Sequence, residues 1–416
     1  MIILRGHMKQ RDVAKLADPS VVAAQAGSKT IPAAPKLAFK PAQADRYRHR
    51  VDRSQSQAAR AKGYRKGRGA AEGPKGRFEV TEHVSFDDGW GSEQTRFEDL
   101  IQRPTTVSED RAKSVLTFNQ SPDLGFDRSV NPYRGCEHGC TYCYARPSHA
   151  FMGLSAGLDF ETKLFAKHNV ADLLEDALRK PGYKVAPIAL GTNTDPYQPV
   201  EAQLKITRSI IEVLCSFRHP FSIITKGHLI TRDLDLLVPM AQRQLCHVAV
   251  SVTTLDRNLK RILEPRTPDG QKRLAAITAL SDEGINVTMM AAPIIPCIND
   301  HELETLMQAG KSAGAHDARY ILIRLPHEIS PMFRNWLKAH FPERAMKVMS
   351  VIRQSRDGKD YQGEFGLRMT GSGEFASLLR QRWRISHRQL GFDASENRFE
   401  LDCSQFRRHP QQMNLF

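Results

Sequence analysis

The stretch FDRSVNPYRGCEHGCTYCYA, residues 126–145, joins a short strand-like run to a loop that carries three cysteines. Its first part, residues 126–131, is one of six short apolar or β-branched runs in the chain. The other five lie at residues 187–192, 221–226, 247–252, 286–291 and 320–325. Runs of this length and composition predict β-strands.

Helical patterns separate these predicted strands. In residues 206–217, five apolar side chains fall on one face of a helix: Ile206, Ile210, Val213, Leu214 and Phe217. Similar segments lie at residues 169–180, 231–242, 256–263, 271–283 and 301–313. Alternating strands and helices pair in parallel through right-handed crossovers. The sequence therefore predicts an α/β fold, a partial (β/α)6 barrel whose chemistry lies on the loops after the strands.

The net charge of +14 is concentrated at the N-terminus. Residues 1–77 hold 18 Lys and Arg against 5 Asp and Glu, whereas residues 78–416 hold 42 against 41. The first segment is poor in apolar residues and cannot offset the entropy of ordering, so we expect a disordered basic tail. Its densest part, residues 46–77, favours contact with nucleic-acid phosphates. The alternative is a solvated tail that only aids solubility.

The rest of the chain divides into four further segments. We expect a lead-in at residues 78–125, the barrel at 126–330, a small helical region at 331–405 and a flexible C-terminal tail at 406–416. No apolar run approaches the roughly 18 residues of a membrane span, so we expect no membrane partner. The seven cysteines are an odd number, and three of them lie close together. This pattern indicates reduced thiols and a cytoplasmic protein rather than a disulfide framework.

The three clustered cysteines, Cys136, Cys140 and Cys143, have the spacing C-x3-C-x2-C. Thiolates this close together select iron–sulfur, zinc or copper(I). His138 or His149 could complete a zinc site, although structural zinc sites usually have a second cysteine pair. Three cysteines on a [4Fe–4S] cluster would leave one iron open to a substrate or cofactor.

The segment CEHGCTYC, residues 136–143, resembles the signature of the radical S-adenosylmethionine (SAM) superfamily, including the aromatic residue before the third cysteine. Longer stretches resemble its DNA-repair-photolyase-like branch, which includes spore photoproduct lyase. Among them are GTNTDPYQPVE (191–201), APIIPCIND (292–300) and ILIRLPHE (321–328). The resemblance covers roughly residues 78–395. It implies a [4Fe–4S] cluster and SAM as cofactors, in an enzyme that cleaves SAM reductively and abstracts hydrogen from its substrate.

The resemblance also implies how the cofactors are bound. The three clustered cysteines would ligate the cluster, and Tyr142 between them would lie near the adenine of SAM. The loop after the second predicted strand would bind the SAM amino group. Its residues here are Asn193, Thr194 and Asp195, and the Gly-Gly-Glu usual in the superfamily is absent.

Three residues at the ends of later strands would complete the cofactor site. Lys226 after strand three would pair with the SAM carboxylate, and Ser251 after strand four would reach the ribose. Arg324 after strand six would lie close to the cofactor and to any anionic group of the substrate. The resemblance further implies a low-potential electron donor of the flavodoxin or ferredoxin type.

One departure from the branch leaves the substrate open. Spore photoproduct lyase uses a hydrogen-donor cysteine beside the loop after strand two, whereas this chain has no cysteine between Cys143 and Cys215. Tyr144 beside the cluster loop and Cys297 after strand five are the candidate catalytic donors. We expect a lyase-like radical SAM enzyme acting on nucleic acid, with damaged DNA favoured. The alternatives are a radical SAM enzyme modifying RNA, protein or a metabolite, and a non-catalytic metal-stabilised nucleic-acid-binding protein.

The final residues, QMNLF (412–416), resemble the peptide by which bacterial replication and repair proteins dock on the β sliding clamp. An extended terminal segment could insert Leu415 and Phe416 into an apolar groove while Gln412 makes a polar contact. The alternative is a C-terminus that folds back onto its own domain.

Overall fold

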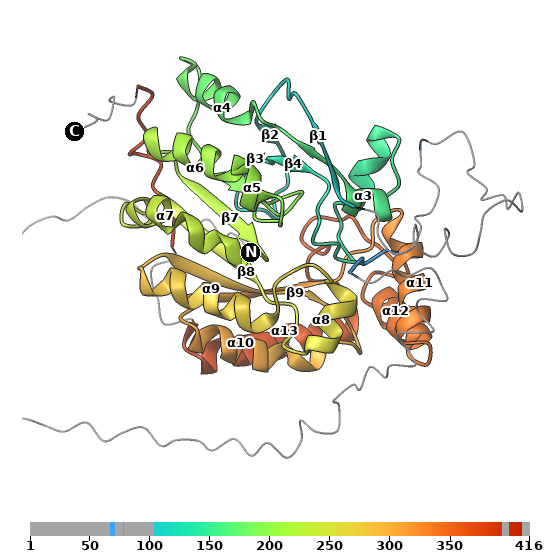
Figure 1. Ribbon diagram of the computed structural model, residues 1–416. Helices are drawn as coiled ribbons and strands as arrows, with labels where there is room; N and C mark the ends of the chain where they lie inside the picture. Colours follow the sequence, from blue (N-terminus) through green and yellow to red (C-terminus); the bar gives the residue numbers. More distant parts are fainter. Residues whose placement is uncertain (1–66, 71–77, 79–103, 393–398, 410–416) are drawn as a thin grey trace, which may run out of the picture. The chain divides into compact units, whose positions relative to one another are not determined.

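The fold is taken from a computed structural model, which describes residues 67–70, 78, 104–392 and 399–409 (Figure 1). Of the basic tail predicted to be disordered, residues 1–77, the parts 1–66 and 71–77 lie outside the described residues, as does the clamp-like peptide at residues 412–416. Residues 67–70 of this tail are described, and Gly69 and Ala70 hydrogen-bond to Glu161. Within them, no helix is long and apolar enough to cross a membrane.

A seven-stranded sheet forms the centre of the described fold, with the strand order β10-β9-β8-β7-β6-β3-β2. Six strands run parallel: β3 (Arg128–Val130), β6 (Ile188–Leu190), β7 (Phe221–Thr225), β8 (Cys246–Ser251), β9 (Asn286–Ile294) and β10 (Asp317–Leu322). The short strand β2 (Thr117–Phe118) adds to β3 in the antiparallel direction. These six parallel strands coincide with the six predicted runs, which confirms the partial (β/α)6 barrel.

Helices connect the parallel strands and cover the outside of the sheet (Figure 1). They are α4 (Val170–Arg179), α5 (Glu201–Leu204), α6 (Ile206–Ser216), α7 (Leu234–Ala241), α8 (Arg257–Leu263), α9 (Gly270–Asp282) and α10 (Leu303–Ser312). Two of them begin at aspartates whose side chains accept backbone N–H groups, Asp256 for α8 and Asp269 for α9. Such caps satisfy donors that have no partner inside the helix, which fixes where each helix starts.

A second, three-stranded sheet has no counterpart in the sequence-based prediction. Its strands are β1 (Thr106–Glu109), β5 (Lys163–Ala166) and β4 (Tyr133–Arg134), in the order β1-β5-β4. The 3-10 helix η2 (Arg146–Met152) and α3 (Leu158–Thr162) lie between β4 and β5 in the chain. These strands of two to four residues are not part of longer apolar runs separated by helical patterns, which is the signal that located the strands of the main sheet.

A separate hydrophobic cluster joins the cysteine loop to the C-terminal helices. Cys140 and Tyr142 pack there with Phe333 and Trp336 of α11 (Ile329–His340), and with apolar residues of α12 (Ala345–Gln354). The indole of Trp336 donates to Ile262 O at the end of α8. The helical C-terminal region, which also includes α13 (Gly373–Gln389), therefore contributes directly to the end of the barrel that holds the cysteines.

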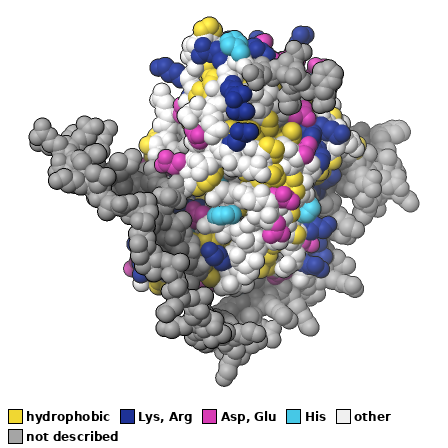
Figure 2. All heavy atoms as spheres, turned by 90° about the vertical axis from the view of Figure 1, so that its left-hand side faces the viewer, with side chains coloured by type: hydrophobic (Ala, Val, Ile, Leu, Met, Phe, Trp, Pro, Cys, Tyr) yellow, Lys and Arg dark blue, Asp and Glu magenta, His cyan; other side chains and the backbone are white. Residues whose placement is uncertain are grey.

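The opposite end of the sheet is covered by residues 399–409. The ring of Phe406 packs against Phe217 and His219, and Arg407 N donates to Phe217 O. On the face shown in Figure 2, basic and acidic side chains are interspersed across the described surface. This pattern agrees with the nearly balanced charge of residues 78–416.

Candidate active site

The three cysteines lie on the loop between β4 and η2, and all three are free thiols. Cys136 and Cys140 are buried, and Cys143 is half-buried. Burial raises the pKa of Cys140 to about 12, and the neighbouring Cys143 contributes to this rise. Burial raises the pKa of Cys136 as well, with contributions from Asp195 and the other two thiols. Three thiolates this close together need positive charge among them, as a metal centre provides.

The donor set fits an iron–sulfur cluster. Soft thiolates favour such a cluster, which takes each cysteine on a different iron atom. In the described part of the chain, no three His, Cys, Asp or Glu side chains are placed to share a single ion. The two imidazoles considered for zinc have other contacts: His138 Nδ1 lies 3.3 Å from Asp195 Oδ2, and His149 Nε2 lies 3.0 Å from Lys163 O.

Gln198, in the loop after β6, holds the backbone on both sides of Cys136. Its Oε1 accepts a hydrogen bond from Glu137 N at 2.9 Å, and its Nε2 donates to Gly135 O at 3.2 Å. The Gln198 side chain is completely buried. It therefore fixes the orientation of the first cluster cysteine relative to the barrel.

Replacing Gln198 with Leu is expected to weaken cluster binding, because the buried Glu137 N–H then has no acceptor. An unpaired buried donor costs about 1–3 kcal/mol. We expect faster loss of iron to a chelator and a shifted cluster reduction potential. The matched control is Gln203→Leu. Gln203 is an exposed glutamine on α5, so this variant should lose iron at the same rate as the unaltered chain. Equal rates of iron loss in both variants would show that Gln198 does not position the cluster loop.

The buried carboxylate of Glu161 makes a second set of contacts that hold the loop carrying the three cysteines. Gly69 N and Ala70 N donate to its two oxygens at 3.0 and 2.9 Å. Arg146 forms an ion pair with Glu161 and donates to Cys140 O at 2.8 Å. Gly69 has no room for a side chain, since a Cβ there would lie 1.7 Å from Gly139 O. Residues 67–70, which fall within the predicted basic tail, thus pack directly on the cluster loop.

Tyr142 anchors the cysteine loop to a buried ion pair between Glu264, which follows α8, and Arg273 of α9. Its hydroxyl donates to Glu264, which forms an ion pair with Arg273. Thr253 Oγ1 also donates to Glu264, at 2.7 Å. Burial alone would raise the pKa of Glu264, but the charges of Arg273 and Lys226 lower it to about 2. The carboxylate is therefore ionised wherever the fold persists above that pH.

The depressed pKa of Glu264 predicts a loss of stability in acid. A carboxylate whose pKa is lower in the folded state stabilises the fold above its unfolded value of 4.5, and this contribution disappears as the pH falls towards about 2. The shift corresponds to a stabilisation on the order of 3 kcal/mol. Urea unfolding between pH 6 and pH 3 should show this loss. A Glu264→Gln variant should lose much less stability over the same range, and an unchanged pH dependence would contradict the assignment.

The loop after β6 carries the predicted binding residues for the SAM amino group. The hydroxyl of Thr194 donates to Tyr133 O at 3.2 Å, and Asn193 N donates to Asn131 Oδ1 at 2.9 Å. Asp195 is engaged at both oxygens. Oδ1 accepts from Thr225 Oγ1 at 2.6 Å, and Oδ2 accepts from Lys226 N at 2.7 Å. Asp195 therefore joins this loop to the end of β7.

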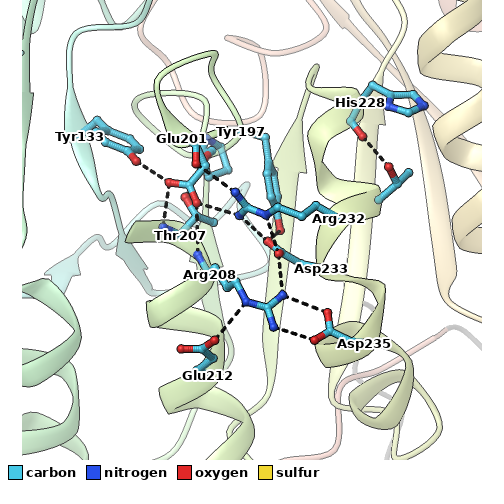
Figure 3. Close-up of polar contacts among 12 residues, drawn as sticks. Tyr133, Tyr197, Glu201, Thr207, Arg208, Glu212, His228, Arg232, Asp233 and Asp235 are labelled. Atoms are coloured by element: carbon cyan, nitrogen blue, oxygen red, sulfur yellow. Dashed lines mark hydrogen bonds and ion pairs between the residues drawn. The ribbon is translucent and has the colours of Figure 1, made fainter. Parts of the chain in front are cut away.

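A buried polar network supports this loop from below (Figure 3). Glu201 accepts from the hydroxyl of Tyr133 and from Arg232, whose Nη2 lies 2.9 Å from Oε1. Asp233 accepts from the hydroxyl of Tyr197 at 3.0 Å and pairs with Arg208. Each of these carboxylates has a cationic partner, and Glu201 fixes the end of the loop where α5 begins.

Lys226 brings a cation to the cluster loop. Its Nζ lies 5.8 Å from the centre of the Tyr142 ring. Burial alone would lower the pKa of Lys226, but the neighbouring Cys140 and Glu264 raise it above its ordinary value. Ser251 ends β8 on the next strand, and its carbonyl accepts from Arg273 Nη1 at 3.0 Å. The structure thus brings Lys226 to the cysteines and places Ser251 beside the same ion pair.

The two candidate hydrogen donors lie in different surroundings. The hydroxyl of Tyr144 donates to Thr192 O, and the Arg324 guanidinium lies 5.2 Å from the centre of its ring. The Cys297 thiol has its pKa raised by burial and by Asp300, while Lys347 and Arg344 lower it. Among contacts of the described residues, none joins Cys297 to Tyr144. The structure therefore brings Tyr144 together with Arg324, whereas Cys297 packs against the hydrophobic cluster that contains Cys140 and Tyr142.

Several residues of this site were not assigned a role from the sequence. Gln198 and Glu264 lie within or beside stretches that resemble the superfamily branch, but their types are common and their partners are distant in the chain. Glu161 and Arg146 had no sequence signal at all. Their importance follows only from the burial of both side chains against the cluster loop.

Comparison with known proteins agrees with this geometry. Residues 130–309 match the family model described as the radical SAM superfamily. The uncharacterized protein Rv2578c of Mycobacterium tuberculosis (strain ATCC 25618 / H37Rv) is 38% identical over 254 residues, which is 60% of this chain and 74% of that protein. The uncharacterized protein MJ0683 of Methanocaldococcus jannaschii is 27% identical over 56% of this chain and 83% of its own length. The chain belongs to the radical SAM superfamily.

Among solved structures, the chain is similar to a spore photoproduct lyase complexed with dinucleoside spore photoproduct. The TM-score is 0.48 at 15% sequence identity, over 68% of this chain and 79% of that chain. Membership in the superfamily implies that this chain is an enzyme with a [4Fe–4S] cluster and SAM as cofactors. The three thiols would hold the cluster, and Lys226 beside Cys140 would bring a cation to SAM.

Proposed function

We propose that this radical SAM enzyme abstracts hydrogen from a nucleic-acid substrate, with damaged DNA as the leading candidate and a lyase-like repair reaction as its outcome. The observation that supports cofactor use most directly is the position of Lys226. It is a half-buried cation beside Cys140 and Tyr142, where the carboxylate of SAM would find a counter-charge. When bound, the cluster would pass one electron to SAM, whose C5′–S bond would break to give methionine and a 5′-deoxyadenosyl radical able to take a hydrogen atom from the substrate.

The residues of the chain have distinct tasks in this proposal. Lys226 binds the SAM carboxylate, and Ser251 reaches the ribose. The amide of Asn193 accepts from the SAM ammonium group. Thr194 and Asp195 hold the loop that presents Asn193, since their own polar atoms are already engaged.

Tyr144 is the proposed hydrogen donor to the product radical. It follows the third cluster cysteine directly, and its ring is 47% exposed while its hydroxyl is held by Thr192 O. Tyr142, by contrast, is buried against Glu264 and acts as an anchor beside the adenine. Cys297 is the alternative donor from the sequence, and its thiol lies next to the cations of Arg344 and Lys347.

Isotope transfer tests the substrate class. Reconstituted protein is incubated with SAM, a reductant and one of three deuterated substrates: damaged DNA, tRNA or protein. The proposal predicts that deuterium appears in 5′-deoxyadenosine with the DNA substrate. Transfer only from tRNA or protein would contradict the DNA assignment while leaving the superfamily chemistry intact.

Three partners follow from the same proposal. A flavodoxin- or ferredoxin-type protein supplies the electron, in a reducing compartment such as the cytoplasm, where the seven free thiols persist.

The basic segment contacts nucleic acid, so deleting residues 1–60 should weaken oligonucleotide binding and make its affinity less dependent on salt. This deletion spares residues 67–70, which hold Glu161. Equal affinity and salt slope without the segment would leave only a solubility role.

The third partner is the bacterial β sliding clamp, bound through Gln412, Leu415 and Phe416. Residues 399–409 are held to the barrel, because Phe406 and Arg407 contact Phe217. Gln412 follows five residues after Arg407 in the sequence. The full chain should bind purified clamp, and a Leu415→Ala, Phe416→Ala variant should not. Equal binding by the variant would contradict this contact.

A further inference from the structure

The barrel is open on one side, between the two strands that end its sheet. In the described sheet β10 pairs with β9 alone, whereas β2 and β3 lie at the other end. Arg324 follows β10, and Tyr144 is tied to the end of β6 through Thr192 O. The contact of 5.2 Å between the Arg324 guanidinium and the Tyr144 ring therefore joins the edge of the sheet at β10 to the loop that carries the three cysteines.

The segment after α12 lines the same opening. Arg324 Nη2 lies 3.4 Å from the hydroxyl of Tyr361, and its Nη1 lies 3.7 Å from the sulfur of Met369. Arg368 forms an ion pair at 2.6 Å with Asp123, which lies on the turn before β3. The segment containing Tyr361 and Arg368 thus bridges the two ends of the sheet.

Arg324 differs from the other arginines near the opening in its partners. Arg368 is neutralised by Asp123, and Arg353 pairs with Asp360 at 2.8 Å. Among the described residues, no carboxylate lies within ion-pair distance of Arg324, and its buried Nε has no hydrogen-bond partner. Burial and the charge of Arg324 lower the pKa of the neighbouring Arg356 to about 10. A positive charge with no carboxylate partner among the described residues therefore lies beside Tyr144 and Tyr361, at the edge of the sheet.

Aromatic rings accompany these cations. Tyr144 and Phe365 are 47% and 52% exposed, and Arg368 lies 4.8 Å from the centre of the Phe365 ring. Cations combined with exposed aromatic rings are typical of sites that bind single-stranded nucleic acid, where phosphates pair with the charges and bases stack on the rings. An acidic peptide would use the charges but would leave the rings without a partner.

We propose that Arg324 binds a phosphodiester of a single nucleic-acid strand at the open side of the barrel, with a neighbouring base against Tyr144 or Phe365. This inference rests on the proposed function and adds to it the place where the strand enters. It assigns Arg324 to the substrate rather than to SAM. The target nucleotide would then lie beside Tyr144 and within reach of the cofactor site.

Oligonucleotide binding by the reconstituted full chain tests the proposal. A fluorescent single-stranded 20-mer, as DNA and as RNA of equal sequence, is titrated at several salt concentrations. Replacing Arg324 with Gln should weaken binding about tenfold and reduce the slope of log K against log salt by about 0.7. The matched control is Arg319→Gln on β10, five residues before Arg324. Arg319 pairs with Asp317 at 2.7 Å, so its replacement should leave both values unchanged.

Two further readouts make the test specific to this opening. Phe365→Ala, which removes an exposed ring without opening the core, should weaken binding about tenfold at an unchanged salt slope. A strand carrying 5-bromouracil should cross-link on irradiation to peptides containing Tyr144, Tyr361 or Phe365. The stronger of the DNA and RNA arms identifies the type of strand.

Unchanged affinity and salt slope in Arg324→Gln, or cross-links confined to residues 1–66, would overturn the inference. Arg324-dependent binding of a glutamate-rich peptide, without binding of either oligonucleotide, would also overturn it. If Arg324→Gln weakened SAM binding but not oligonucleotide binding, the inference would be overturned and Arg324 would be assigned to SAM. None of these readouts requires SAM cleavage, so a failure of the proposed chemistry is seen separately.

Discussion

Replacing Cys140 with Ala is expected to abolish cluster assembly. The loop offers three thiols, and Cys140 lies next to both Tyr142 and Lys226 inside the second hydrophobic cluster. With two thiolates left, anaerobically reconstituted protein should hold little iron and sulfide after gel filtration, and SAM cleavage should fall to the level of a protein-free control. The same result is expected for Cys136→Ala and Cys143→Ala.

The control for this experiment is Cys215→Ala. Cys215 lies on α6, where its thiol donates to Leu236 O at 3.5 Å, and it has no contact with the cluster loop among the described residues. This variant should retain iron, sulfide and activity. Full iron and sulfide content in Cys140→Ala would contradict the assignment of the cluster ligands.

The largest effect on stability is expected for Glu264→Ala. Glu264 and Arg273 are both buried, and the substitution leaves the guanidinium without a carboxylate. Removing one partner of a buried ion pair typically costs about 3–5 kcal/mol. The variant also removes the acceptor of the Tyr142 hydroxyl, so we expect a lower urea midpoint together with weaker iron retention.

A double variant measures how much of the stability loss comes from the interaction between Glu264 and Arg273. In Glu264→Leu, Arg273→Leu no unpaired charge remains, so its loss of stability should be smaller than the sum of the two single losses. Glu283→Ala, at an exposed position after α9, should change the midpoint by less than about 0.5 kcal/mol. Additive effects of the Glu264 and Arg273 substitutions would show that the two side chains do not depend on each other.

The sequence was sufficient to predict the barrel, because its six strands lie in apolar or β-branched runs and most of its helices carry a clear hydrophobic period. It also located the cluster loop, since three cysteines at this spacing have few other uses. The three-stranded sheet escaped prediction because its strands, such as β4 (Tyr133–Arg134), are too short to show a period.

The contacts that fix the site could not be read from the sequence. Glu161 accepts from Gly69 and Ala70, which lie more than 90 positions earlier in the chain. Neither the basic segment nor α3 carries a pattern that predicts this pairing.

For Asp195, the sequence suggested a role that the contacts of the structure change. It was expected at the SAM amino group, and the structure shows that its oxygens hold Thr225 Oγ1 and Lys226 N. In the proposed function it therefore holds the loop that presents Asn193 to SAM.

The central claim is that this chain cleaves SAM reductively at a cluster held by Cys136, Cys140 and Cys143. The most direct test is anaerobic reconstitution of the full chain with iron and sulfide, followed by addition of SAM and a strong reductant. The account predicts about four irons and four sulfides per chain. It also predicts 5′-deoxyadenosine that forms only when the reductant is present. Stoichiometric zinc in place of iron, or a fully loaded cluster that yields no 5′-deoxyadenosine, would contradict it.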